Sequence, residues 1–123
     1  MRTIALLAAL ALAGCGAGGS RAQARTAVER FYAAYHRHDG RAACAQLSAG
    51  LRSQLAGNCA ETVLKLRLHD SATAAVRVYA TSAQVVLAHG DTVFLGVAGG
   101  GWRIDALGCR PRDGGPYECE EPA

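Results

Sequence analysis

The sequence lacks an apolar run long enough to cross a bilayer, and it lacks a strong excess of charge of either sign. Its longest apolar stretch is the ten residues 4–13, which rise about 15 Å as a helix, roughly half of a hydrocarbon core. Lys and Arg number 13 against 10 Asp and Glu. This balance is too mild and too scattered to indicate a nucleic-acid-binding protein, so we expect no nucleic-acid partner.

Motifs for metal binding and for nucleophilic catalysis are also missing. No C-x-x-C pair occurs, and the gaps of 14, 49 and 9 residues between the four later cysteines fit no zinc pattern. No Ser lies in a Gly-x-Ser-x-Gly elbow. Glycines 99–101 precede a Trp, not the Lys of a phosphate loop. His36 and His38 point to different helix faces and make no metal pair. We therefore predict no metal, no cofactor and no catalytic residue.

The N-terminus, in contrast, carries a clear pattern. A positive start, a short apolar core and small residues after it are typical of a secretory signal peptide. Leu12-Ala13-Gly14-Cys15 resembles the lipobox of bacterial lipoproteins, which implies a signal peptide at residues 1–14 and lipid on Cys15. The Gly-rich start of the next stretch predicts a flexible tether at residues 15–24. The alternatives are cleavage after the A-x-A at 22–24 and a buried free thiol at Cys15.

The resemblance to lipoproteins implies two or more acyl chains, such as palmitate, and two chains anchor a protein stably. We therefore expect a protein held on the extracytoplasmic face of the cell membrane. In an exported domain of this size, four further cysteines indicate two disulfides with three alternative pairings. We favour Cys44–Cys59 and Cys109–Cys119, because each closes a short loop and contributes about 3 kcal/mol.

Helical spacing of apolar residues comes first along the chain, and a period of two follows. The pattern predicts helices at 24–38, 41–47, 49–55 and 59–68. Asp39-Gly40 ends the first helix, with Gly40 as its left-handed cap. Short strands are predicted at 74–80, 83–89, 92–98 and 102–107. The fold class is therefore α+β: N-terminal helices packed on a four-stranded antiparallel meander, with the domain at 25–109 and a disulfide-stapled tail at 110–123.

This layout resembles the nuclear transport factor 2-like cone, and more narrowly the small actinobacterial cell-envelope lipoproteins of that type. The residues that carry the resemblance are 27–44, 100–109 and 116–120, about a third of the mature chain. The resemblance implies a fold and a cellular address. It implies no reaction, because the cone hosts enzymes, scaffolds and binders alike.

Strand parity bears on whether the cone holds a catalytic base. None of the residues predicted to face inward titrates: they are Val76, Val78, Val85, Leu87, Val93, Leu95, Val97, Trp102 and Ile104. A one-residue slip in register would reverse every face. Because no residue predicted to face inward can act as a general base, we expect a non-enzymatic binding or interaction module. The alternative is an isomerase- or dehydratase-like enzyme that uses Tyr35, His36, Asp39 or His89 in the pocket.

Two candidate binding surfaces follow from the same parity. The pocket candidates, which would take a small apolar ligand, are Tyr32, Tyr35, His36 and Trp102. On the outward face, Tyr79, Val86 and Phe94 form an apolar strip that fits an envelope protein partner. The alternative is that segment 108–123 folds over this strip.

Overall fold

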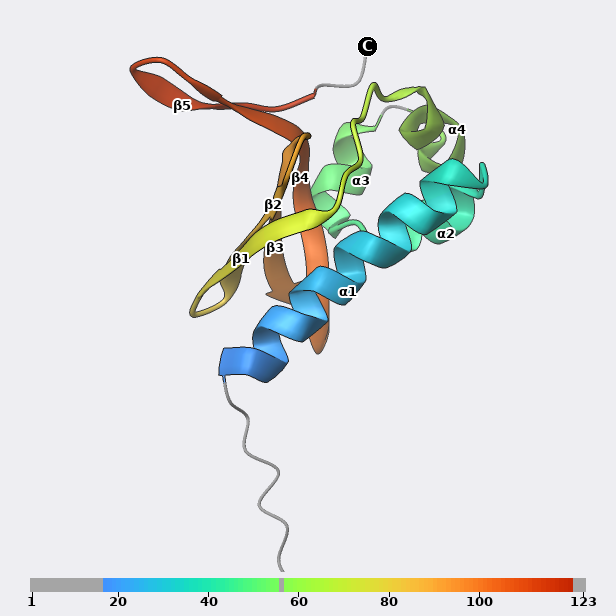
Figure 1. The fold of residues 1–123 in the computed structure, drawn as a ribbon. Helices are drawn as coiled ribbons and strands as arrows, with labels where there is room; N and C mark the ends of the chain where they lie inside the picture. Colours follow the sequence, from blue (N-terminus) through green and yellow to red (C-terminus); the bar gives the residue numbers. More distant parts are fainter. Residues whose placement is uncertain (1–16, 56, 121–123) are drawn as a thin grey trace, which may run out of the picture.

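Helices come first and an antiparallel sheet follows in the computed structural model, which describes residues 17–55 and 57–120 (Figure 1). The predicted α+β class is confirmed. The helical elements are α1 (Ala17–His36), α2 (Gly40–Ala45), α3 (Ala49–Gln54), α4 (Cys59–Thr62) and the 3₁₀ helix η1 (Val63–Lys65). The strands are β1 (Thr73–Tyr79), β2 (Ser82–Leu87), β3 (Thr92–Ala98), β4 (Gly101–Arg112) and β5 (Gly115–Glu118), ordered β1-β2-β3-β4-β5.

Helix α1 lies across the inner face of the sheet and supplies one side of the core. It begins at Ala17, so the predicted flexible tether is wrong for residues 17–24. Ala, Arg and Gln, which are strong helix formers, make up much of this stretch, and Ala24 is fully buried. The candidate lipidation residue Cys15 lies outside the described residues. Among the described residues, no helix has the length and apolar content of a membrane span.

The turn between α1 and α2 differs from the prediction. Gly40 is not the left-handed cap: His38 takes that conformation, with φ 58°, and Gly40 begins α2. Asp39 caps α2, since its Oδ1 accepts a hydrogen bond from the Ala42 N–H at 3.1 Å. Gly40 serves a different purpose, because a Cβ there would overlap the backbone carbonyl of Ala60 in α4.

The helix predicted at 59–68 is shorter in the structure. Helix α4 ends at Thr62 and passes into η1, and the backbone is extended at Leu66. The extended turn lets Leu66 reach the core, where its side chain is 6% exposed. It also presents the Leu66 carbonyl to α1, where the Tyr35 hydroxyl donates a hydrogen bond to it at 2.6 Å.

Both favoured disulfides are present. Cys44–Cys59 joins α2 to α4, beside the close approach of Gly40 to Ala60. Cys109–Cys119 joins β4 to the residue that follows β5. The two bonds lie in separate parts of the fold, so each restrains its own segment of the unfolded chain.

The inner face of the sheet is apolar, as the strand parity predicts. Val85, Leu95 and Ile104 are 0–2% exposed, and Val76 and Val78 are half-buried against the core. Val97 is an exception at 48% exposed. It lies at the end of β3, beside the tight turn to β4, where the sheet runs past its cover.

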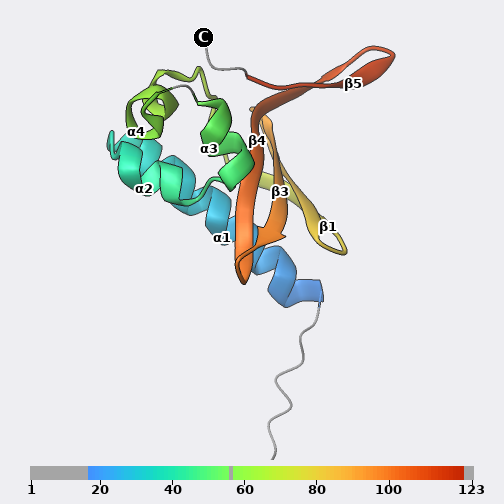
Figure 2. The same ribbon diagram turned by 180° about the vertical axis from the view of Figure 1, so that it is seen from behind.

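The meander has a fifth strand that was not predicted. Residues 110–112 extend β4, and β5 pairs with them antiparallel, so the tail is a hairpin arm that projects from the sheet (Figures 1 and 2). The arm has no alternating apolar pattern, and Pro111 and Pro116 are tolerated because the arm is an edge. The turn pair Asp113-Gly114, with Gly114 at φ 69°, is the sequence signal for such a hairpin.

The connection between α2 and α3 covers an open edge of β4. The Ser48 N–H donates to the Ile104 carbonyl and the Ile104 N–H donates to the Gln46 carbonyl, both at 2.8 Å. Leu47, between them, is fully buried and belongs to the same hydrophobic core as Phe31 of α1. These bonds satisfy backbone groups that an edge strand would otherwise leave unpaired.

We predict that Gly40→Ala lowers the free energy of unfolding by about 1–3 kcal/mol, because the new methyl group meets backbone that has no rotamer to change. Gly50→Ala in the exposed part of α3 is the matched control. Its nearest neighbour would be the Ser48 Oγ at 3.9 Å, and we expect a gain of about 0.4–1 kcal/mol. Urea denaturation of both variants tests this, and equal midpoints would contradict the tight contact.

Candidate functional site

A pocket opens at the rim of the interface between α1 and the sheet, between the second half of α1 and the segment that leads into β1. Its volume is about 490 Å³. We call it the rim pocket. It is lined by Val28, Glu29, Tyr32, Ala33, His36, Asp70, Ser71, Ala72, Thr73 and Leu87. Deeper between α1 and the sheet, the space is filled by core side chains such as Phe31, Leu95 and Ile104, each at most 2% exposed. The rim pocket therefore lies at the edge of the interface between α1 and the sheet, and a smaller hollow of about 360 Å³ lies beside Trp102 and the first half of α1.

The hydroxyl of Tyr32 is the unusual group of the rim pocket. Tyr32 is 3% exposed, and its hydroxyl oxygen has no hydrogen-bond partner in the part of the chain that the structure describes. Burial, then the charges of Asp91 and Asp70, raise the pKa of this hydroxyl well above its usual range. Tyr32 therefore stays neutral and can donate or accept a hydrogen bond. A buried polar group without a partner costs about 1–3 kcal/mol.

His36 and Asp70 face each other at the mouth of the pocket. The Nε2 of His36 lies 3.0 Å from the Oδ2 of Asp70, and the side chains are 57% and 34% exposed. The His36 ring also lies near Tyr32, with ring centroids 6.3 Å apart. At this exposure the ion pair adds little to stability. Its effect is to place an imidazole and a carboxylate where a ligand would enter.

Asp91 is a buried carboxylate that strand parity did not reveal. It lies in the turn before β3 and is 1% exposed. Its Oδ1 accepts from the Nε of Arg110 at 3.2 Å, and its Oδ2 accepts from the His69 N–H at 3.0 Å. These bonds tie the segment before β1 to β4. The Gly90-Asp91 pair indicates a turn in the sequence, and nothing in that pattern shows that the carboxylate points inward.

The structure brings together some of the residues proposed for a pocket and separates others. Tyr32 and His36 line the rim pocket, and Tyr35 contacts both rings while its hydroxyl is held by Leu66. Trp102 lies near the first half of α1, beside the turn from β3 to β4. Asp39 is engaged as the cap of α2.

His89, the last of the residues named for an enzyme, is exposed in the turn after β2. Its backbone N–H donates to the Oγ of Ser71 at 2.9 Å. Ser71 itself lines the rim pocket. The bond thus fixes one wall of the pocket from the turn, while the imidazole of His89 is outside the residues that line it.

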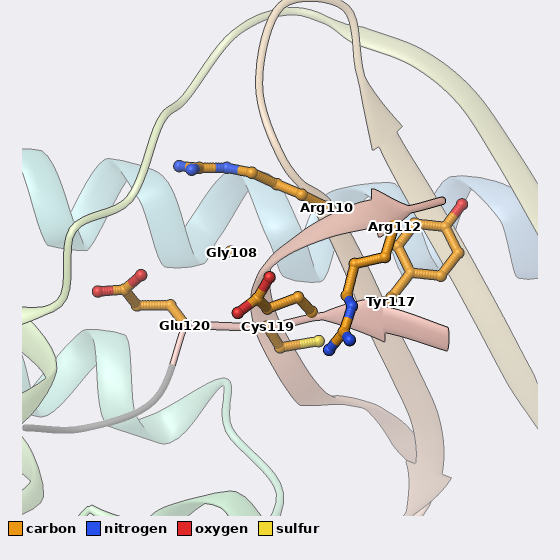
Figure 3. A pocket seen from close by; sticks show the side chains of 7 residues that line it. Gly108, Arg110, Arg112, Tyr117, Cys119 and Glu120 are labelled. Atoms are coloured by element: carbon orange, nitrogen blue, oxygen red, sulfur yellow. The ribbon is translucent and has the colours of Figure 1, made fainter. Parts of the chain in front are cut away.

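Another hollow lies on the hairpin arm and has a volume of about 590 Å³ (Figure 3). Its charged walls carry both signs, Arg110 and Arg112 against Glu118 and Glu120. Arg110 is already paired with Asp91. We regard this hollow as a weaker candidate, because the charges of its own walls offset one another and Arg110 has a partner.

The apolar strip on the outward face is only partly covered. The ring of Phe94 packs edge-on against Tyr117 of the arm, with centroids 5.1 Å apart, so the tail shields that end of the strip. Val86 is half-buried. Tyr79, at the other end, is 60% exposed. The alternative that the tail covers the strip therefore holds at Phe94, and the open part of the strip is the neighbourhood of Tyr79.

No protein-family model, no curated protein and no solved structure matches this chain. The resemblance to the nuclear transport factor 2-like cone therefore stays a prediction. Within residues 17–55 and 57–120, no three His, Cys, Asp or Glu side chains group closely enough to hold a metal ion. The chemistry of the rim pocket is the remaining basis for a functional assignment.

We predict opposite effects for two neighbouring tyrosines. Tyr32→Phe raises the free energy of unfolding by about 1 kcal/mol, because it removes a buried hydroxyl that has no partner. Tyr35→Phe lowers it by about 1 kcal/mol, because the Leu66 carbonyl loses its donor. Urea denaturation of the ligand-free protein measures both. A loss of stability in Tyr32→Phe as large as in Tyr35→Phe would mean that the Tyr32 hydroxyl has a partner.

Proposed function

We propose that this chain is a membrane-anchored extracytoplasmic lipoprotein whose folded domain binds a small molecule in the rim pocket without catalysing a reaction. The observation that carries the proposal is Tyr32, which is among the residues that line a pocket of about 490 Å³ and whose buried hydroxyl has no hydrogen-bond partner among the described residues. Ligand sites typically combine apolar walls with a few well-placed polar groups. A ligand that hydrogen-bonds to the Tyr32 hydroxyl removes the free-energy cost of burying that hydroxyl without a partner.

The lining of the rim pocket points to the chemistry of the ligand. Val28, Ala33 and Leu87 offer apolar contact, and Tyr32 offers one hydrogen bond at the buried end. Glu29 and Asp70 add negative charge at the mouth, which disfavours an anionic ligand. We therefore propose a mainly apolar molecule, uncharged or cationic, with one polar group.

The address rests on the N-terminal pattern and on the cysteines. The resemblance of residues 12–15 to a lipobox supports lipid on Cys15. The two disulfides are compatible with an oxidising compartment outside the cytoplasm. The likeness to cone-type envelope lipoproteins agrees with both features. A protein partner at the sheet is less favoured, because the arm covers Phe94.

The His36–Asp70 pair supports a second candidate function. A carboxylate 3.0 Å from an imidazole can orient it as a general base, and the Tyr32 hydroxyl in the same pocket can donate to a developing oxyanion. This set fits an isomerase- or dehydratase-like reaction, in which a proton is removed beside a carbonyl group. The exposure of His36 weighs against this candidate, since water competes for its proton.

We predict that the full chain, extracted under native conditions from its own membranes, carries extra mass that is lost on denaturation. In Tyr32→Phe, the fraction of protein that carries this extra mass should fall at least ten-fold, because a buried hydrogen bond to the ligand is removed. Tyr79→Phe, an exposed site on β1, is the matched control and should keep it. Native mass spectrometry reads all three proteins. Retention in Tyr32→Phe equal to the control would exclude the rim pocket as the site.

His36→Ala separates the two candidate functions. For a binding module, the variant retains the bound mass within a few-fold, since His36 lies at the mouth. For an enzyme, it converts added ligand at least a hundred-fold more slowly than the parent chain. The ligand recovered from the denatured protein is the substrate for this assay, and its mass before and after incubation is the readout. An unchanged ligand with the parent chain would contradict the enzyme.

We also predict that the intact denatured protein begins at Cys15, carries lipid and is four hydrogens lighter than the reduced chain. Cys15→Ser should lose the lipid and should be released from membranes by a high-salt wash that leaves the parent chain bound, because the acyl chains then no longer hold it. Mass spectrometry and membrane fractionation measure the two effects. A chain that begins at Arg25 without lipid would contradict the anchor and leave the rim pocket to be judged by its ligand.

A further inference from the structure

One end of the molecule gathers three segments that are distant in sequence. They are the start of α1 and the two hairpin turns β1–β2 and β3–β4, which lie at the same end in both views (Figures 1 and 2). The Val97 N–H donates to the Thr81 carbonyl at 3.0 Å and so joins the two hairpins. We call residues 17–27, 76–84 and 96–104 the anchor-side end.

The three segments of the anchor-side end hold four basic residues and no acid of their own, and the carboxylate of Asp105, the residue that follows the third segment, lies against Gly96. Nine of the 13 Lys and Arg residues remain elsewhere in the chain, against all ten acids. Even with Asp105 counted at this end, four arginines there face one acid, whereas the nine other basic residues face nine acids. The four arginines are Arg21, Arg25, Arg77 and Arg103, of which the first three are exposed.

Exposed apolar side chains occur at the same end. Among the described residues, the exposed large hydrophobic side chains are Tyr79, Val97 and Tyr117, and the first two lie at the tips of the hairpins of the anchor-side end. Arginine and tyrosine both combine an apolar body with a polar tip, which suits the boundary between headgroups and acyl chains. Arg103 also donates from Nη1 to the Trp102 carbonyl at 2.9 Å, so its stem lies along the turn.

The position of the candidate lipid fixes where this end must be. Cys15 precedes the first residue of α1, Ala17, by two positions. Two residues span at most about 7 Å even when fully extended. A lipid on Cys15 therefore holds the start of α1 close to the headgroups.

We infer that the anchor-side end rests on a bilayer rich in anionic phospholipid, with its arginines against the phosphates and the two hairpin tips at the interface. This inference rests on the proposed function only for the lipid that brings the end to the membrane; the basic surface itself belongs to the folded domain. Juxtamembrane arginines each contribute about five-fold in affinity for an anionic surface. A second copy of the chain is a poorer occupant, because it would place like charges opposite one another.

The surface is tested on the chain from residue 15 with Cys15→Ser, so that no lipid contributes. Sedimentation with vesicles of phosphatidylcholine and phosphatidylglycerol in equal parts should carry down the protein, and pure phosphatidylcholine vesicles should not. Replacing both Arg21 and Arg25 by Gln should weaken binding about 25-fold. Arg67→Gln with Arg112→Gln, which remove the same charge at the opposite end, should leave binding within two-fold. Thermal unfolding confirms that each variant is folded.

Equal losses in the two double variants would overturn the inference, because binding would then follow net charge and not this surface. The absence of any binding to phosphatidylglycerol vesicles would overturn it as well. Neither result bears on the anchor, which the intact mass of the membrane-extracted chain decides separately. A lipidated chain whose folded domain ignores anionic vesicles would keep the proposed function and exclude the docking surface.

Discussion

The burial of one side of α1 against the inner face of the sheet is the contact on which the rest of the structure depends. Ala24, Val28 and Phe31 form a continuous apolar stripe, each at most 1% exposed, at the helical spacing that brings them to one face. The register shifts in the pairing of β1 with β2 and of β3 with β4, and the extra residues lie on β1 and β4, where such irregularities bend a strand. Tyr32 follows Phe31 directly. The packing that buries the stripe therefore also buries the Tyr32 hydroxyl next to the rim pocket. The candidate site is thus a consequence of how the helix is seated.

The two disulfides stabilise segments of the chain that the hydrophobic core does not hold in place alone. Cys44–Cys59 holds α2 against α4, two helices too short to be stable by themselves. Cys109–Cys119 closes the hairpin arm, whose residues are largely exposed and contribute little apolar burial. Asp91 then ties the arm side of β4 to the segment before β1. Covalent bonds and one buried carboxylate therefore hold the parts that the stripe on α1 does not reach.

The sequence predicts those features that depend on periodicity. Alternation identifies β1 to β4 and their inner faces, and loop length favours both disulfides. Features that depend on three-dimensional neighbours are missed: Gly40 is a close-approach residue because Ala60 lies against it, and Asp91 points inward because Arg110 and His69 meet it. Helical continuity from Ala17 is missed because Gly18 and Gly19 indicate a linker by composition. In the candidate site, Tyr32 and His36 follow from their place on α1, whereas Asp70 and the lack of a partner for the Tyr32 hydroxyl need the fold.

Helix α1 is one uninterrupted element of 20 residues, about 30 Å long. Its length bears on how far the rim pocket lies from the membrane surface. For a chain anchored at Cys15, the N-terminal end of α1 lies at the lipid headgroups and the rest of the helix extends away from it. Tyr32 lies roughly 20 Å along α1 from Ala17. A molecule still embedded among acyl chains does not reach the Tyr32 hydroxyl from there. The rim pocket would therefore draw its ligand from the aqueous space above the membrane, and lipid that binds there would first have to leave the bilayer.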